Sequence, residues 1–284
     1  MTSLIPTPEL RATALAALTL CAFSALALAS HLHVRFFDHR GVHTLQVYAG
    51  VLAAVTGFGL VVLGPAALGR EAAVWGLVAG PVLGAAAAPL IATADTAITR
   101  RFARRASTRP TPVRTTATAP RTRATRAVGA AAKLTAGAGG EGPAPAVERR
   151  WTASRRDSDV ALPLVWLVAV GVLEECVFRG ALTGVALHQH AWSLRVLILL
   201  LATAAFALSH IFFGWAQVVA KLPLSCVALA LTLATGTVLG AVVAHALFNA
   251  RIWRYQNTVR ATAPRPGAPA SAPGAKPRVQ RAGS

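Results

Sequence analysis

Two adjacent glutamates interrupt an otherwise apolar stretch of the chain, at about residues 161–187. They are Glu174 and Glu175, and among the ten acidic residues we expect only these two to lie well inside an apolar span. A charge near the middle of a bilayer costs at least about 2.5–3.5 kcal/mol, so ionisable residues there usually mark a functional site. Arg179 lies four residues after Glu175 on the same helix face, which predicts an ion pair between them. Glu174 points about 100° away around the helix and is left free to act as a base.

Histidine and asparagine side chains interrupt two further apolar segments. His210 lies near the end of one of them, and His245 and Asn249 lie in the last one, four residues apart and therefore on one helix face. Each side chain would be costly facing lipid, whereas a shared polar interior would satisfy all of them. Any one of these residues could simply join two helices by hydrogen bonds. Together with the glutamate pair, these polar side chains occupy three separate segments, which favours a common polar site.

The composition indicates that these segments belong to a membrane protein. The chain has 284 residues, of which 55% are hydrophobic and 13% charged, with a mean hydropathy of +0.54. A transmembrane helix needs about 20 mainly apolar residues. The sequence therefore predicts an all-α fold, a polytopic membrane helix bundle of about seven transmembrane helices. Their approximate positions are 12–30, 45–64, 72–94, 161–187, 194–213, 217–234 and 238–250.

Positive charge is concentrated between and after the predicted spans, and the formal net charge is +18. Residues 95–160 are rich in Thr, Arg, Pro and Ala without a hydrophobic period, which predicts a disordered loop between the N-terminal membrane helices (1–94) and a second membrane segment (161–250). Residues 251–284 form a basic tail that we also expect to be disordered. Lys and Arg are enriched in cytoplasmic loops, and seven spans place both basic segments on that side. We therefore predict a multi-pass cell-membrane protein that attracts anionic lipid headgroups and binds no nucleic acid.

The order of the polar motifs resembles that of one known family. Glu-Glu-x-x-x-Arg, Phe-x-x-x-His and His-x-x-x-Asn, on successive spans over about residues 160–250, are similar to the CPBP family, which includes the type II CAAX prenyl proteases. The resemblance implies that residues 161–250 are the catalytic core of an intramembrane endopeptidase acting on membrane-embedded or membrane-associated proteins or peptides. The roles that it implies are water activation by Glu174 and His210, oxyanion stabilisation by His245 and Asn249, and ordering of Glu174 and Glu175 by Arg179.

Several alternatives stay open beside this interpretation. Histidines and glutamates could bind zinc, but their spacing is not His-Glu-x-x-His and the three cysteines have no metal-like spacing, so we expect no cofactor. A non-proteolytic CPBP-like membrane protein, with a role in bacteriocin immunity or as a scaffold, is the alternative function. A proton-coupled carrier could also use buried Glu, His and Arg, but no inverted repeat is visible between the two halves.

Overall fold

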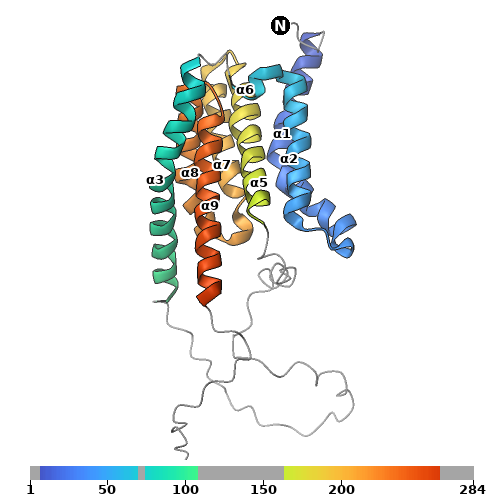
Figure 1. Cartoon of the computed structure of the whole chain (residues 1–284). Helices are drawn as coiled ribbons and strands as arrows, with labels where there is room; N and C mark the ends of the chain where they lie inside the picture. The colour runs from blue at the N-terminus through green and yellow to red at the C-terminus, as the bar shows by residue number, and fades with distance from the viewer. Residues whose placement is uncertain (1–6, 70–73, 108–162, 263–284) are drawn as a thin grey trace, which may run out of the picture.

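A computed structural model describes residues 7–69, 74–107 and 163–262 of the chain. Within these ranges nearly every residue is helical, and the only β-type contact is an isolated bridge between Gly69 and Thr237. The long helices lie side by side in one bundle (Figure 1). The predicted all-α fold is confirmed.

The described part of the chain contains a helix at the place of each predicted span. The fourth, fifth and sixth elements in the order below join without a break, so that one continuous helical run contains the glutamate pair. The helices are α1 (Pro8–Leu32), α2 (Thr44–Leu63), α3 (Val74–Ser107), α5 (Leu164–Glu175), a π-helical segment (Cys176–Ala181), α6 (Leu182–Leu187), α7 (Trp192–Leu208), α8 (Trp215–Thr235) and α9 (Leu239–Thr262).

Several helices have the length and composition of membrane spans. Among the described residues, four helical stretches are long and apolar enough to cross a membrane, and Trp192–Leu208 is a shorter apolar helix. Large apolar side chains remain exposed on the outside of the bundle, for example Leu20 and Leu90. Extensive exposed apolar surface of this kind fits a hydrocarbon environment. The structure is therefore that of an all-α membrane helix bundle. The four stretches are Glu9–Arg40, Thr44–Ala67, Val74–Arg105 and Trp215–Thr235.

Two helices extend beyond their predicted ends. Helix α3 continues to Ser107, so the predicted start of the loop at residue 95 is wrong for residues 95–107. Helix α9 continues to Thr262, so the predicted tail is helical over residues 251–262. No proline occurs between the start of α9 and Pro264, and proline is the residue that most strongly stops a helix. The rest of the predicted loop and tail lies outside the described residues.

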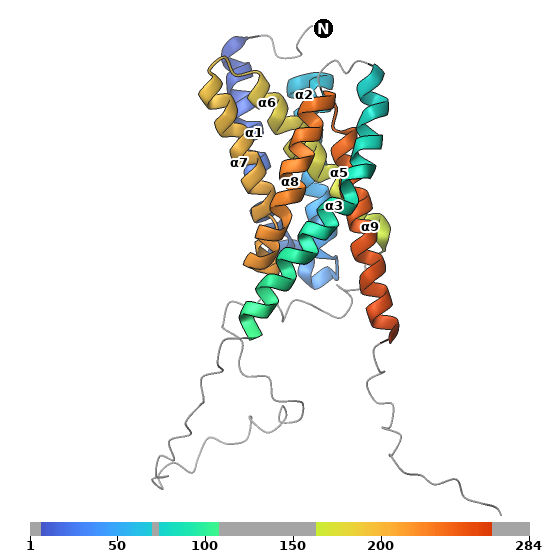
Figure 2. The same cartoon turned by 90° about the vertical axis from the view of Figure 1, so that its left-hand side faces the viewer.

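Helices α3 and α9 cross at very short range, and glycines make this approach possible (Figure 2). A Cβ atom added at Gly84 would overlap the carbonyl oxygen of Gly240, and one added at Gly240 would lie 2.9 Å from the carbonyl oxygen of Gly80. Gly80 and Gly84 are spaced as in the small-xxx-small pattern that lets membrane helices pack backbone to backbone. This crossing joins the N-terminal helices to α9, which carries two of the predicted site residues.

We predict that Gly84→Ala destabilises the protein, because its methyl group has no room beside Gly240. Overpacking of this kind costs about 1–3 kcal/mol, so the thermal unfolding midpoint in detergent should fall by several degrees. Gly57→Ala is the matched control, because Gly57 is a helical glycine of α2 with open space around it. An equal effect of both substitutions would contradict the close crossing.

Candidate active site

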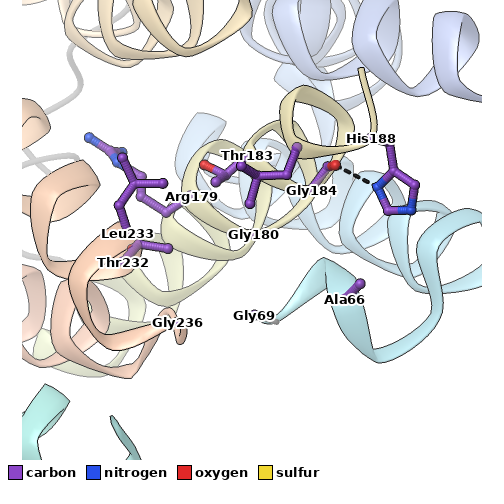
Figure 3. Close-up of a pocket in the computed structure, with 11 residues that line it drawn as sticks. Ala66, Gly69, Arg179, Gly180, Thr183, Gly184, His188, Thr232, Leu233 and Gly236 are labelled. Carbon is purple, nitrogen blue, oxygen red and sulfur yellow. Dashed lines mark hydrogen bonds between the residues drawn. The ribbon is translucent and has the colours of Figure 1, made fainter. Parts of the chain in front are cut away.

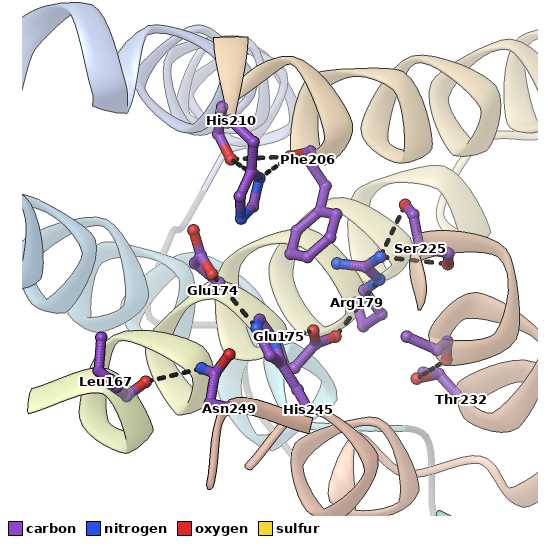
Figure 4. A network of polar contacts seen from close by, with 12 residues as sticks. Leu167, Glu174, Glu175, Arg179, Phe206, His210, Ser225, Thr232, His245 and Asn249 are labelled. Atoms are coloured by element: carbon purple, nitrogen blue, oxygen red, sulfur yellow. Dashed lines mark hydrogen bonds and ion pairs between the residues drawn. The ribbon is translucent and has the colours of Figure 1, made fainter. Parts of the chain in front are cut away.

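The helical run through α5 and α6 carries the glutamate pair and its arginine (Figure 4). Glu175 and Arg179 are buried, at 0% and 2% exposure, and Arg179 Nε lies 3.3 Å from Glu175 Oε2. The predicted ion pair is confirmed. Arg179 Nη2 also donates to the carbonyl and hydroxyl oxygens of Ser225, at 3.1 and 2.7 Å, and its guanidinium carbon lies 4.1 Å from the ring centroid of Phe206. One buried cation therefore joins the α5–α6 run to α7 and α8.

Glu174 is held by partners other than the arginine. The hydroxyl group of Tyr48, on α2, donates to Glu174 Oε1 at 3.0 Å. His245 Nε2 lies 3.8 Å from Glu174 Oε2. Glu174 thus faces a polar interior, and its side chain is separate from the closest contacts of Arg179, as the helix geometry predicts.

Helix α9 brings His245 and Asn249 against α5. His245 Nδ1 lies 2.8 Å from Glu175 Oε1, so this imidazole lies between the two glutamates. Asn249 Nδ2 donates to the carbonyl oxygen of Leu167 at 2.9 Å. A Cβ at Gly171 would lie 3.0 Å from Asn249 Nδ2 and 3.4 Å from the His245 ring. The absence of a side chain at Gly171 therefore gives both polar residues room beside α5.

His210 lies in the turn after α7 and not inside a helix, because α7 ends at Leu208. Its Nδ1 atom lies 3.1 Å from the carbonyl oxygen of Phe206 and 3.1 Å from the hydroxyl oxygen of Ser209. A carbonyl oxygen only accepts hydrogen bonds, so we assign the proton of the neutral ring to Nδ1, which leaves Nε2 as an acceptor. The ring points toward Glu174 in Figure 4. The predicted location inside a continuous apolar helix is wrong, but the residue faces the shared interior.

The Phe206 ring contacts the guanidinium group of Arg179 and both histidine rings of this interior. Its centroid lies 5.4 Å from that of His210 and 5.6 Å from that of His245. Phe206 is fully buried, at 0% exposure. The ring therefore fixes the spacing of the two histidines and covers the guanidinium group of Arg179.

Sequence reasoning missed Tyr48 and Ser225, which contact the glutamate pair and its arginine. Tyr48 is one of two tyrosines in the chain and lies inside an apolar span, where a phenol needs a hydrogen-bond partner. That pattern could have marked it. Ser225 offered no such signal, because a serine in an apolar helix can bond to a carbonyl of its own helix.

A separate cavity of about 360 Å³ adjoins the site beyond Arg179 (Figure 3). Glycines line much of it, and its polar lining includes Thr183 and His188. Arg179 is the site residue that lines this cavity, and neither the glutamates nor the histidines of the site do so. The space is therefore distinct from the interior around Glu174. Its lining residues are Ala66, Gly69, Arg179, Gly180, Thr183, Gly184, Leu187, His188, Thr232, Leu233 and Gly236.

Histidine, cysteine, aspartate and glutamate side chains are the groups that could hold a metal ion in this site. In the part of the chain that the structure describes, no three or more His, Cys, Asp and Glu side chains are grouped so as to hold a metal ion. His245 Nδ1 and Glu175 are engaged with each other and with Arg179. The described donors are thus arranged as a hydrogen-bonded and ion-paired network.

Comparison with known proteins identifies the segment that contains these residues. Residues 156–251 match the family model described as type II CAAX prenyl endopeptidase Rce1-like. The curated proteins and the solved structures give no match. The chain therefore carries an Rce1-like domain of the CPBP family, and the resemblance predicted from the motifs is confirmed for this segment. All six predicted site residues lie within it, whereas Tyr48 lies outside it.

We predict that Arg179→Met strongly destabilises the protein, because it leaves Glu175 buried without its cation. Removing one partner of a buried ion pair typically costs about 3–5 kcal/mol. Thermal unfolding in detergent measures the effect. Arg195→Met is the control, because Arg195 on α7 is only half-buried and donates to the backbone carbonyl of Gln189. Similar losses in the two variants would argue against a special role for the buried pair.

Proposed function

We propose that the protein is an intramembrane endopeptidase that hydrolyses peptide bonds of membrane-associated proteins or peptides. The observation that carries this proposal is the meeting of Glu174, His210 and His245 in one buried interior of an Rce1-like domain. Among the described residues, the polar contacts of the Glu174 carboxylate are the Tyr48 hydroxyl group and, at 3.8 Å, His245 Nε2. A carboxylate in that situation keeps an oxygen lone pair for a water molecule.

Glu174 and His210 activate the attacking water in this mechanism. The water molecule donates one hydrogen bond to Glu174 and can donate another to His210 Nε2, the free acceptor of that ring. Proton transfer from water to a positioned base then produces the nucleophile, and such catalysis contributes about 10²–10⁴-fold to a rate. Tyr48 holds the Glu174 carboxylate in place during this step.

His245 and Asn249 stabilise the oxyanion that forms at the scissile carbonyl. The amide of Asn249 has two N–H donors, of which one binds the carbonyl oxygen of Leu167, so the second remains for the substrate. His245 is the second donor to the oxyanion in this mechanism, and its ring lies between the two glutamates. The contacts with Glu175 and Gly171 orient the ring for this role.

The arrangement of the bundle supports a multi-pass topology with its basic end in the cytoplasm. Figure 1 shows the C-terminal ends of α3 and α9 at the same end of the bundle as the start of α5, opposite the N-terminus. That end carries Arg100, Arg101 and Arg104 on α3 and Arg251 and Arg254 on α9. Arginines beside spans favour the cytoplasmic side and attract anionic headgroups. We propose the cell membrane as the location and no nucleic-acid partner.

The proposal predicts that Glu174→Gln reduces proteolysis by at least about 100-fold, because the amide cannot accept a proton from water. The purified protein in detergent is incubated with membrane proteins of the source cell, and new peptide termini are counted by mass spectrometry. Glu9→Gln is the matched control, since it makes the same chemical change at an exposed position of α1.

Two outcomes of this experiment separate the candidate functions. Proteolysis that persists in Glu174→Gln contradicts the assigned mechanism. A wild-type protein that cleaves nothing contradicts the endopeptidase and favours an immunity or scaffold protein that contains the same domain.

We also propose that the water is activated without a metal ion, and this has its own prediction. Incubation with a strong chelator, followed by dialysis, should leave the cleavage rate unchanged. The control is the same chelator already saturated with zinc. A loss of activity that added zinc restores would show a zinc enzyme instead.

A further inference from the structure

An ion pair between α3 and α8 is buried away from the glutamates, and each of its charges is the partner of the other. Lys221 Nζ lies 2.6 Å from Asp95 Oδ1, and the two side chains are 10% and 9% exposed. The expectation that, among the acidic residues, only Glu174 and Glu175 lie well inside the apolar part of the chain is therefore wrong. Asp95 follows the apolar stretch of α3 directly, and only the continuation of this helix to Ser107 shows that it is buried.

The hydroxyl group of Thr183, in α6, is buried without such a partner. Thr183 is 3% exposed, and its Oγ1 atom has no hydrogen-bond partner among the described residues. Of the described Ser and Thr side chains in this situation, Thr183 is the one that lines the cavity beside Arg179. A buried hydroxyl group left without a hydrogen bond is costly. This unsatisfied group in the wall of the cavity therefore indicates a ligand atom that would meet it.

The wall of the cavity is closely packed and is not a loose gap between helices. A Cβ atom added at Gly180 would overlap the carbonyl oxygen of Ala67, and one added at Gly184 would lie 2.9 Å from Leu63 Cδ1. These glycines bring the α5–α6 run against the short 3-10 helix Gly64–Ala67. The cavity volume of about 360 Å³ falls in the range of small-ligand pockets, about 300–1,000 Å³, and far exceeds the roughly 10–15 Å³ that admits one water molecule.

His188 supplies a hydrogen-bond acceptor at the outer end of the cavity (Figure 3). The residue is exposed whereas Thr183 is buried, so the cavity runs inward from the end of α6. His188 Nδ1 lies 2.8 Å from the carbonyl oxygen of Gly184. We assign the proton of the neutral ring to Nδ1, because a carbonyl oxygen only accepts hydrogen bonds, and Nε2 is then an acceptor. A ligand can therefore accept a hydrogen bond from Thr183 and donate one to His188.

The lining of the cavity favours a neutral ligand. Arg179 is the charged residue in the described lining, and its guanidinium group already contacts Glu175 through Nε and Ser225 through Nη2. Figure 4 shows this group beside Phe206, on the side of the active site. The described lining contains no Asp, Glu or Lys. An ion would therefore enter without a free counter-charge, which is unfavourable in a buried space.

The spacing of the two polar groups indicates the length of the ligand. Thr183 and His188 are separated by five positions in the chain, which corresponds to about 7.5 Å along a helix that rises 1.5 Å per residue. Two residues of an extended chain span about 7 Å, since each contributes about 3.3–3.6 Å. A chain with two amide groups can therefore place a carbonyl oxygen at Thr183 and an N–H group at His188.

We propose that the cavity beside Arg179 is a binding site for a short neutral amide chain of about two peptide units. The Thr183 hydroxyl group donates to a carbonyl oxygen at the inner end of this ligand, and His188 Nε2 accepts from an N–H group at its outer end. The site is separate from the interior around Glu174, so the proposal goes beyond the proposed function and is tested without any cleavage assay.

Thermal unfolding of the full-length protein in detergent measures binding, because a ligand of the folded state raises the unfolding midpoint as its concentration increases. The probe is N-acetylalanine amide, a neutral molecule with two amide groups. We expect a saturable rise of the midpoint. Thr183→Val should raise the dissociation constant about 2–10-fold, because it removes one hydrogen bond, whereas Thr183→Ser keeps the hydroxyl group and should bind as the wild type does. Thr203→Val is the matched control, since Thr203 on α7 donates to the carbonyl oxygen of Leu199 in its own helix.

Chemical labelling locates the bound probe. Diethyl pyrocarbonate modifies the unprotonated imidazole, and His188 is exposed to it. A saturating concentration of the probe should slow the modification of His188 several-fold, as measured by mass spectrometry. His190 is the internal reference, because it is exposed, lies two positions further on and is not among the residues that line the cavity.

Four results would overturn the proposal. The absence of a saturable rise would show a cavity that takes only water. Equal or tighter binding of N-acetylalanine, which has a carboxylate in place of the terminal amide, would show an anion site at Arg179 Nη1, an atom without a hydrogen-bond partner among the described residues. Undiminished binding in Thr183→Val, or an equal loss in Thr203→Val, would contradict the assigned contact. Loss of binding in Glu174→Gln with retention in Thr183→Val would place the probe in the interior around Glu174 instead.

Discussion

The burial of charge inside an apolar bundle is the constraint on which the rest of the structure depends. Glu175, Arg179 and His245 have almost no exposed surface. Each is tolerable there only because the others and a serine on α8 satisfy it. Since these partners come from α5, α8 and α9, pairing the charges also fixes how the three helices pack. These side chains therefore hold the helices together, and in the proposed function some of them also take part in the chemistry. Glu174 is kept partly apart from this network.

The N-terminal helices contribute directly to the part of the chain that matches the Rce1-like family. Tyr48 on α2 binds Glu174, and Asp95 on α3 binds Lys221. Both contacts join residues that are far apart in the sequence and cross the boundary of the matched segment. Helix α3 can provide this support because glycines bring its backbone against that of α9. The matched segment is thus one part of a single packed bundle and not a separate unit within the described residues.

The sequence predicted much of the fold, and the reasons are local. Long apolar segments locate the helices, since the bilayer requires length and low charge. The spacing of Glu175 and Arg179 predicts their pair because residues four apart share a helix face. The ends of α3 and α9 were predicted less well, because a basic composition does not prevent a helix from continuing while it has no proline and finds tertiary contacts.

What the sequence by itself determined was six of the polar residues in the apolar segments, their family resemblance and the pairing of Glu175 with Arg179. Only the tertiary structure decided which groups meet across helices. Tyr48 with Glu174, His245 between two glutamates and Asp95 with Lys221 all depend on the relative position and rotation of helices. No periodicity within one helix encodes that arrangement, because it results from packing and charge pairing over the whole bundle.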